Sequence, residues 1–137
     1  MKKAITSRAD VEELVNRFYD RVKADELIGP IFNEIARVNW NKHLPIMYDF
    51  WSSILLDEDV YHRNAMIPHL QLNKRFPLQE EHFQRWLQLF DETVNTYFEG
   101  EKAALAKFRA HSIAGVMQTK LGLLKQIQTS QHKHENP

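Results

Sequence analysis

Apolar residues recur three or four positions apart along almost the whole chain, which is the spacing of a buried helix face. Three runs stand out: Val11, Leu14, Val15, Phe18, Tyr19 and Val22; Trp40, His43, Leu44, Met47, Trp51, Ile54 and Leu55; and Phe83, Trp86, Leu87, Phe90, Val94, Tyr97 and Phe98. No segment of any length alternates apolar and polar residues with the period of two that is typical of strands. The pattern therefore predicts an all-α protein with about five or six helices of unequal length.

Capping and turn residues indicate where these helices begin and end. Ser7 and Asp10 are both suitable N-caps for the first helix, which should end before the turn sequence Gly29-Pro30. The apolar residues 31–32 that follow should return to the core. Gly100 should end the third run, because glycine favours helix termination.

A short helix is predicted within residues 64–76, NAMIPHLQLNKRF, with Asn64 as its cap and Pro68 in its first turn. A last helix should run from about Glu101 to Ile127, where the polar C-terminal sequence begins. Helices of such different lengths do not suggest a plain four-helix bundle.

The composition fits one domain, over residues 1–127, followed by a polar tail, residues 128–137, that we expect to be disordered. Lys and Arg total 18 and Asp and Glu total 18, so the chain lacks the excess of positive charge that nucleic-acid binding requires. No apolar run approaches the roughly 20 residues of a membrane span, and the N-terminus lacks the apolar stretch of a signal peptide. We therefore expect a cytoplasmic protein. We also expect a monomer, because no broad apolar face is left over for a partner.

Cysteine is absent, which excludes disulfides, thiol nucleophiles, cysteine zinc sites, iron–sulfur clusters and the motif for covalent haem attachment. The histidines do not form the zincin motif HExxH, and the nearest approach to a di-iron pair is a single Asp59-x-x-His62. Four scattered glycines cannot form a phosphate-binding loop. The spacing therefore favours none of these metal or phosphate sites.

Five of the seven histidines are expected to lie away from a site. His62 and His82 are surrounded by charged residues and should be at the surface. His111 should be a core or boundary residue of the last helix. His132 and His134 lie in the polar tail and should be solvated.

The other two histidines, His43 and His69, lie on apolar faces, as do Tyr19 and Trp86. A buried Tyr or Trp needs a partner for its O–H or N–H, and any one of the four side chains could find its partner in a backbone carbonyl. Because the four come from four helices of a small protein, a second interpretation is that they converge on one flat, apolar ligand with a coordinating nitrogen and several donors around it. Haem is such a ligand.

Five stretches of the chain together resemble the truncated haemoglobins, most closely those of group III: FYDRV, IGPIF, NKHLPIMYDFW, PHLQL and FQRWLQLF. The resemblance covers residues 8–127. The scarcity of glycine also fits group III, since the other groups use glycine pairs at helix boundaries. The resemblance implies a shortened globin fold, in which helices sandwich a non-covalently bound b-type haem.

The resemblance also implies roles for individual residues. His69 in PHLQL matches the proximal ligand of the haem iron. Tyr19, Trp86 and His43 match distal residues that surround the gas ligand. The haem contacts that we expect from the resemblance are Phe18, Phe32, Met47, Trp51, Met66, Leu70 and Phe76.

Two points stay open at the level of sequence. Pro45 follows His43 by two residues, and a proline inside a helix loses a hydrogen bond. Either the helix begins near Leu44 or it bends there, and His43 could then swing outward as a gate. Lys74 and Arg75 follow the proximal helix and are candidate partners for the haem propionates, although a solvated pair of charges is an equal alternative.

The resemblance implies a protein that binds diatomic gases, namely oxygen, NO and CO. Two distal donors predict slow oxygen release, which suits sensing, or chemistry on the bound oxygen, better than oxygen delivery. The resemblance implies nitric oxide detoxification by dioxygenation or a peroxidase-like reaction. Turnover would also need a reductase that the sequence does not identify, so the sequence leaves open whether the protein is an enzyme. The alternative from another class is a cofactor-free helical interaction module, in which the aromatic stripes are ordinary core.

Overall fold

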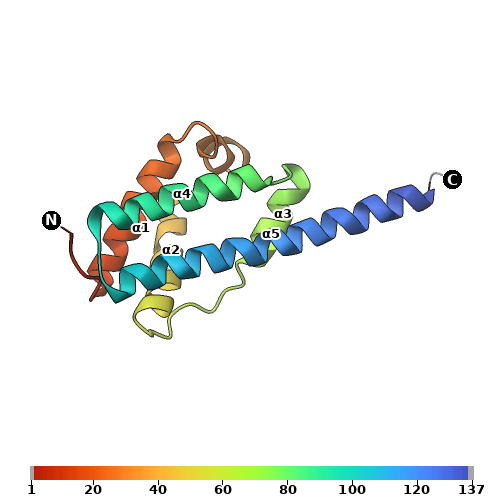
Figure 1. Ribbon diagram of the computed structural model, residues 1–137. Coiled ribbons are helices and arrows are strands. Elements are labelled where there is room, and N and C mark those ends of the chain that lie inside the picture. Colours follow the sequence, from red (N-terminus) through yellow and green to blue (C-terminus); the bar gives the residue numbers. More distant parts are fainter. Residues whose placement is uncertain (1, 136–137) are drawn as a thin grey trace.

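Helices make up nearly all of the regular structure (Figure 1). The computed structural model describes the backbone of residues 2–135 and the side chains of residues 2–122. The elements in this part are α1 (Arg8–Ala24), the π-helical turn η1 (Ile31–Ile35), α2 (Trp40–Leu55), α3 (Met66–Arg75), α4 (Glu80–Tyr97) and α5 (Glu101–Glu135). The one extended pairing among the described residues is an isolated bridge between Lys3 and Phe98. The prediction of an all-α protein is confirmed.

The core lies between two pairs of helices, α1 with α2 and α4 with α5. α4 and α5 run antiparallel, joined by a turn at Gly100, whose φ of 97° favours glycine. α1 packs against α2 and α4, and α2 also packs against α5. α3 packs against α5 and lies near the start of α4, at one end of this arrangement (Figure 1). α3 contributes no fully buried residue, so the main core is formed by the other helices.

The N-terminus of α1 is closed by a capping box. The Asp10 backbone N–H donates to the Ser7 hydroxyl at 3.4 Å, while the Asp10 carboxylate accepts from the backbone N–H groups of Thr6 at 2.9 Å and of Ser7 at 3.2 Å. Of the two predicted caps, Ser7 is therefore the N-cap. The Thr6 backbone N–H, the Lys3 ammonium and the Thr6 hydroxyl, against the effect of burial, lower the pKa of Asp10 to about 2.

α2 begins at Trp40 and continues through Pro45. The backbone N–H of His43 donates to the carbonyl of Asn39 at 2.8 Å, so His43 lies at the start of the helix. Pro45 has no N–H to donate to the carbonyl of Asn41, four residues earlier. The turn that carries His43 is therefore held to the rest of α2 by one hydrogen bond fewer than in an uninterrupted helix.

α3 is a short helix within the predicted residues 64–76. The Asn64 side chain accepts the Met66 N–H at 3.0 Å, as expected of a capping residue, although the helix is counted from Met66 with Ala65 before it. Pro68 is the third residue of the helix, in the first turn, where a missing N–H costs no intrahelical bond.

α5 continues to Glu135, which is beyond the predicted end at Ile127. The side chains from residue 123 on, including those of His132 and His134, lie outside the described residues. The extent of the folded domain and the disorder of the tail therefore stay predictions.

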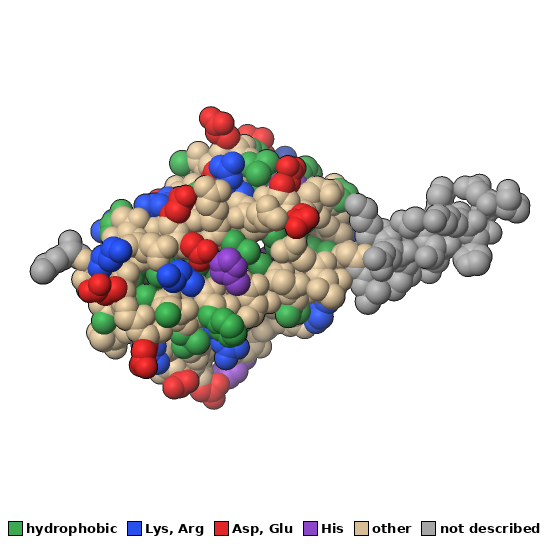
Figure 2. All heavy atoms as spheres, in the orientation of Figure 1, with side chains coloured by type: hydrophobic (Ala, Val, Ile, Leu, Met, Phe, Trp, Pro, Cys, Tyr) green, Lys and Arg blue, Asp and Glu red, His purple; other side chains and the backbone are tan. Residues whose placement is uncertain are grey.

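The surface is mixed in charge. Acidic and basic side chains are interspersed on the face shown in Figure 2, in keeping with the equal totals in the sequence. None of the described helices is long and apolar enough to cross a membrane.

Candidate functional site

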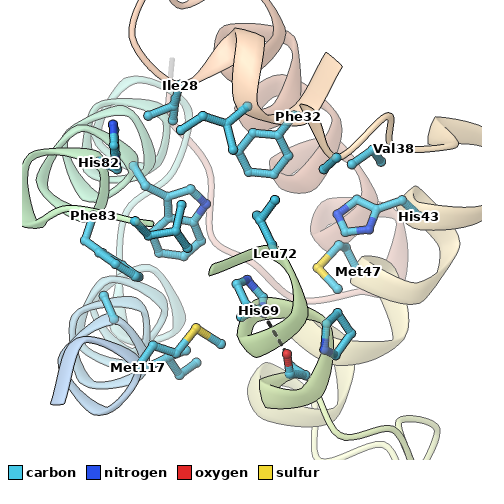
Figure 3. Close-up of a pocket in the computed structure, with 18 of the residues that line it drawn as sticks. Ile28, Phe32, Val38, His43, Met47, His69, Leu72, His82, Phe83 and Met117 are labelled. Carbon is cyan, nitrogen blue, oxygen red and sulfur yellow. Dashed lines mark hydrogen bonds between the residues drawn. The ribbon is translucent and has the colours of Figure 1, made fainter. Parts of the chain in front are cut away.

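A cavity of about 390 Å³ lies between α3 and the other helices, and all six elements contribute to its walls (Figure 3). Most of the lining side chains are apolar, as in sites for bulky apolar ligands. Eight of the residues that the sequence analysis selected line it: Tyr19, Phe32, His43, Met47, Trp51, His69, Arg75 and Trp86. The structure thus brings together side chains that are far apart in the sequence.

His69 lines the cavity from α3 (Figure 3). Its Nδ1 lies 2.7 Å from the carbonyl oxygen of Ala65, one turn earlier on the same helix. Because a carbonyl can only accept, Nδ1 donates its proton, and in the neutral ring Nε2 is then the nitrogen with the lone pair. Metal-binding histidines are commonly fixed in this way by a backbone carbonyl. The hydrogen bond of Nδ1 therefore leaves Nε2 of His69 as the ring nitrogen available to a metal.

His43 faces the same cavity from α2 (Figure 3). Its Nε2 is buried and has no hydrogen-bond partner among the described residues. Burial lowers the pKa of His43, and the neighbouring His69 lowers it further. An unpaired nitrogen on a buried, neutral ring is costly unless a ligand pairs with it. His43 is thus available to a polar atom inside the cavity.

Tyr19 and Trp86 complete the polar groups on the inner walls. Tyr19 is 4% exposed, and burial raises the pKa of its hydroxyl, so it remains a protonated donor at neutral pH. No described residue forms a hydrogen bond with the Tyr19 hydroxyl or with the Trp86 N–H. Both donors are therefore free for a ligand.

Other rings hold these side chains in place. The Tyr19 ring lies 4.8 Å from that of Phe18 and 5.4 Å from that of Trp40, between centroids. Trp86 meets the Phe18 ring edge to face at 5.3 Å and stacks on Phe90 at 5.7 Å. Phe18, a predicted haem contact, thus does not line the cavity but supports two residues that do. Such packing fixes the rotamers of Tyr19 and Trp86.

Four more of the selected residues do not line the cavity: Met66, Leu70, Lys74 and Phe76. Leu70 follows His69 directly and is turned by about 100° around the helix. Leu72, three residues after His69, shares its face and projects into the cavity instead (Figure 3). Phe76 packs against the ring of His82, with centroids 5.5 Å apart.

Other residues also line the cavity, although the sequence did not single them out as site residues. They include Ile28, Ile31, Val38, Phe50, Leu72, Leu78, His82, Phe83, Ile113, Ala114 and Met117. The apolar periodicity already assigned Phe83 to a buried face. For the three residues of α5, only the packing of α5 beside α3 places them here.

His82 and His111 differ from their predicted positions, whereas His62 agrees with its prediction. His62 is at the surface as predicted, with its side chain 69% exposed. His82, also predicted at the surface, is only 11% exposed and lines the cavity. His111, predicted in the core or at its boundary, is exposed and lies with its Nε2 2.7 Å from a carboxylate oxygen of Asp91. Charged neighbours in the sequence thus indicated the exposure of His62 correctly but not that of His82.

A sequence profile described as "Bacterial-like globin" matches residues 3–119 of the chain. The chain belongs to the bacterial-like globin family. A curated relative, the group 3 truncated hemoglobin ctb of Campylobacter jejuni, is 32% identical over 124 residues, which cover 88% of this globin and 95% of the relative. The crystal structure of the group III truncated hemoglobin from Campylobacter jejuni superposes with a TM-score of 0.77 at 32% identity and the same coverage. The resemblance to truncated haemoglobins and the globin fold are confirmed.

Globins are haem proteins whose iron is held by a proximal histidine, so this chain is a haem-binding globin. Within the described residues, no three His, Cys, Asp or Glu side chains lie close enough to hold a metal ion by themselves. A haem iron needs only one ligand from the protein, because the porphyrin nitrogens already hold the metal. The apolar cavity, with the imidazole of His69 held by Ala65 and with two unpaired donors on Tyr19 and Trp86, fits that cofactor.

Proposed function

We propose that this globin binds haem b non-covalently in the cavity, with His69 as its proximal ligand and with Tyr19, Trp86 and His43 on the side of the gas ligand. The observation that carries the proposal is the hydrogen bond of the His69 Nδ1 to Ala65, which leaves Nε2 as the free nitrogen of a residue facing an apolar cavity. Phe32, Met47 and Trp51, which also line this cavity, would contact the porphyrin.

When bound, the haem supplies an iron atom that takes up oxygen, NO or CO. The chain supplies the polar surroundings. Tyr19 and Trp86 each offer a donor with no described protein partner, and His43 offers a buried nitrogen. Because the remaining walls are mostly apolar, a polar ligand can satisfy these groups with little competition from water.

Two donors favour retention of a polar ligand over its rapid release. A hydrogen bond to a charged partner contributes about 1.5–3 kcal/mol, and each 1.4 kcal/mol changes an equilibrium tenfold. We therefore propose chemistry on bound ligands, either nitric oxide detoxification or a peroxidase-like reaction, rather than oxygen delivery. Sustained turnover of either kind requires a reductase, and the cytoplasm remains the expected location.

One absorption spectrum of the purified protein tests the cofactor. A red protein with a strong Soret band is expected. A colourless protein that does not take up added haem would overturn the proposal and favour the cofactor-free helical interaction module.

The ligand assignment is tested by His69→Ala. The variant should lose haem or retain it only in the presence of added imidazole, which replaces the missing ligand. The matched control is His111→Ala, because His111 is exposed and away from the cavity. An unchanged five-coordinate ferrous spectrum of His69→Ala would show that another residue is the ligand.

A further inference from the structure

The two donors that face the cavity belong to helices far apart in the sequence. Tyr19 lies on α1 and Trp86 on α4. Phe18 packs against both rings, but apolar packing is not directional. A hydrogen bond weakens steeply with distance and angle, so both donors can reach one small ligand only if the spacing of α1 and α4 is closely held. Polar contacts between α1 and α4 can supply that constraint.

Asp25 and Arg85 form such a contact at the end of α1. A guanidinium nitrogen of Arg85, the residue before Trp86, donates to a carboxylate oxygen of Asp25 at 3.0 Å. The Asp25 side chain is only 7% exposed. A carboxylate so far from water depends on its partners, and removal of one leaves its charge uncompensated. The pair thus ties the end of α1 to the turn of α4 that carries Trp86.

The Asp25 carboxylate is also held from its own side. Its other oxygen accepts the backbone N–H groups of Leu27 at 3.1 Å and of Ile28 at 3.0 Å. Gly29 then passes directly against the end of α1, where a Cβ atom would lie 2.9 Å from the carbonyl oxygen of Lys23. The carboxylate therefore belongs to a closely packed corner, from which Ile28 projects into the cavity (Figure 3).

One other ion pair among the described residues joins α1 to α4, and it differs in each of these respects. Arg21 lies 3.7 Å from a carboxylate oxygen of Glu92, and both side chains are more exposed than that of Asp25. Glu92 is seven residues, or about two turns, beyond Arg85 on α4. An exposed pair at that distance contributes little. It therefore serves as a matched control between the same two helices.

We propose that Asp25 and Arg85 are positioning residues for the Trp86 N–H, and that their ion pair holds this donor where it can reach the ligand that Tyr19 also reaches. Neither Asp25 nor Arg85 lines the cavity, so the pair acts through the backbone of α4. This inference rests on the proposed function, because the ligand concerned is the gas held at the iron. The hydrogen bond itself remains the contribution of Trp86.

Two variants break the ion pair from opposite sides. Arg85→Met keeps the long side chain but removes its donors. Asp25→Asn keeps an oxygen for the N–H groups of the corner but presents an amide NH2 to Arg85. Oxygen release by stopped flow and the C–O stretching frequency of the CO complex are measured for each holoprotein. The frequency responds to polar groups beside the bound gas, which a merely structural effect would leave in place.

Both variants are also made in a Trp86→Phe background, because residues that act through one another are not additive. Arg85→Lys, which keeps the charge, tests for rescue. Arg21→Met is the control for loss of an ion pair between α1 and α4.

Arg85→Met and Asp25→Asn should each accelerate oxygen release by roughly 3- to 10-fold, less than removal of the donor itself, because the N–H remains but is displaced. Both should raise the C–O stretching frequency. In the Trp86→Phe background, which has no indole N–H, neither should change the rate or the frequency. Arg85→Lys should recover part of the native rate, and Arg21→Met should leave both quantities unchanged.

Equal acceleration with and without the indole N–H would show that the pair acts on the cavity by another route, and the inference would be wrong. Native rates in both Arg85→Met and Asp25→Asn would also overturn it. If Arg85→Met does not fold, Asp25→Asn decides the question, since it retains the bonds of the corner. An unchanged release rate in Trp86→Phe alone would instead refute the proposed role of Trp86 and this inference with it.

Discussion

The rings of Tyr19 and His43 meet edge to face, with their centroids 5.4 Å apart and their planes at 82°. They belong to α1 and α2, which pack against each other. A movement of His43 away from the cavity would therefore uncover an edge of Tyr19. Because contacting residues couple, the effects of substituting these two side chains should not be additive.

His43→Ala should change how fast ligands reach the cavity more than how tightly they bind. The turn that carries His43 lacks one hydrogen bond at Pro45, so the imidazole can act as a movable barrier. Flash photolysis of the CO complex should show faster rebinding from solvent, with a smaller change in oxygen affinity. Lys42→Ala, an exposed neighbour, is the control. A loss of oxygen affinity as large as that of Tyr19→Phe would make His43 a principal donor instead.

Tyr19→Phe and Trp86→Phe should each accelerate oxygen release by roughly 10- to 100-fold, from the loss of one hydrogen bond to a charged partner. Both changes keep an aromatic ring, so the packing of Phe18 and Phe90 against them is largely retained. CO carries less charge on its outer atom, and its release should change much less. Stopped-flow rates for both gases provide the measurement. Equal acceleration for the two would indicate a change of cavity shape.

Pro45→Ala should stabilise the fold by about 1–2 kcal/mol. An interior proline costs a helix about 3 kcal/mol, and the greater freedom of the unfolded alanine chain offsets part of that gain. Urea unfolding gives the free energy, and slower CO rebinding should accompany it as the His43 turn stiffens. Pro68→Ala is the control, since Pro68 lies in a first turn and its replacement restores no bond. Equal stabilisation by both would contradict this account.

Asp10→Asn should lower the free energy of unfolding at pH 7 by about 1–2 kcal/mol. The folded protein lowers the pKa of Asp10 to about 2, below the value of about 3.9 in an unfolded chain. The contribution of the carboxylate is therefore complete above pH 4 and is lost as the pH falls toward 2. The difference between native and variant proteins should shrink over that range. Glu12→Gln, at an exposed position of the same helix, should show a smaller difference.

The helices could be predicted from sequence because each has one continuous apolar face. Trp40 and Leu55 bound both the predicted stripe and α2. The candidate site residues Tyr19, Trp86, His43 and His69 could be recognised for a related reason, since a polar group on an apolar face needs a partner. His69 and Tyr19 satisfy that rule and line the same cavity.

The remaining lining residues depend on contacts between distant segments. Met117 borders the cavity because α5 passes beside α3, and no local pattern encodes that approach. His82 is buried because its ring accepts a backbone N–H and packs against Phe76, although charged residues surround it in sequence. Leu72 could have been preferred to Leu70 from helix geometry alone, because residues three apart share a face.

The cavity walls run from Tyr19 to Met117, so they exist only when almost the whole chain has folded. Because most of the lining is apolar, an unfilled cavity leaves apolar surface in contact with water, and filling it with an apolar ligand would stabilise the fold. Haem would then be the missing piece of the hydrophobic core as well as the reactive centre. Cellular haem supply would consequently set how much of this polypeptide survives proteolysis, so that abundance itself reports cofactor availability.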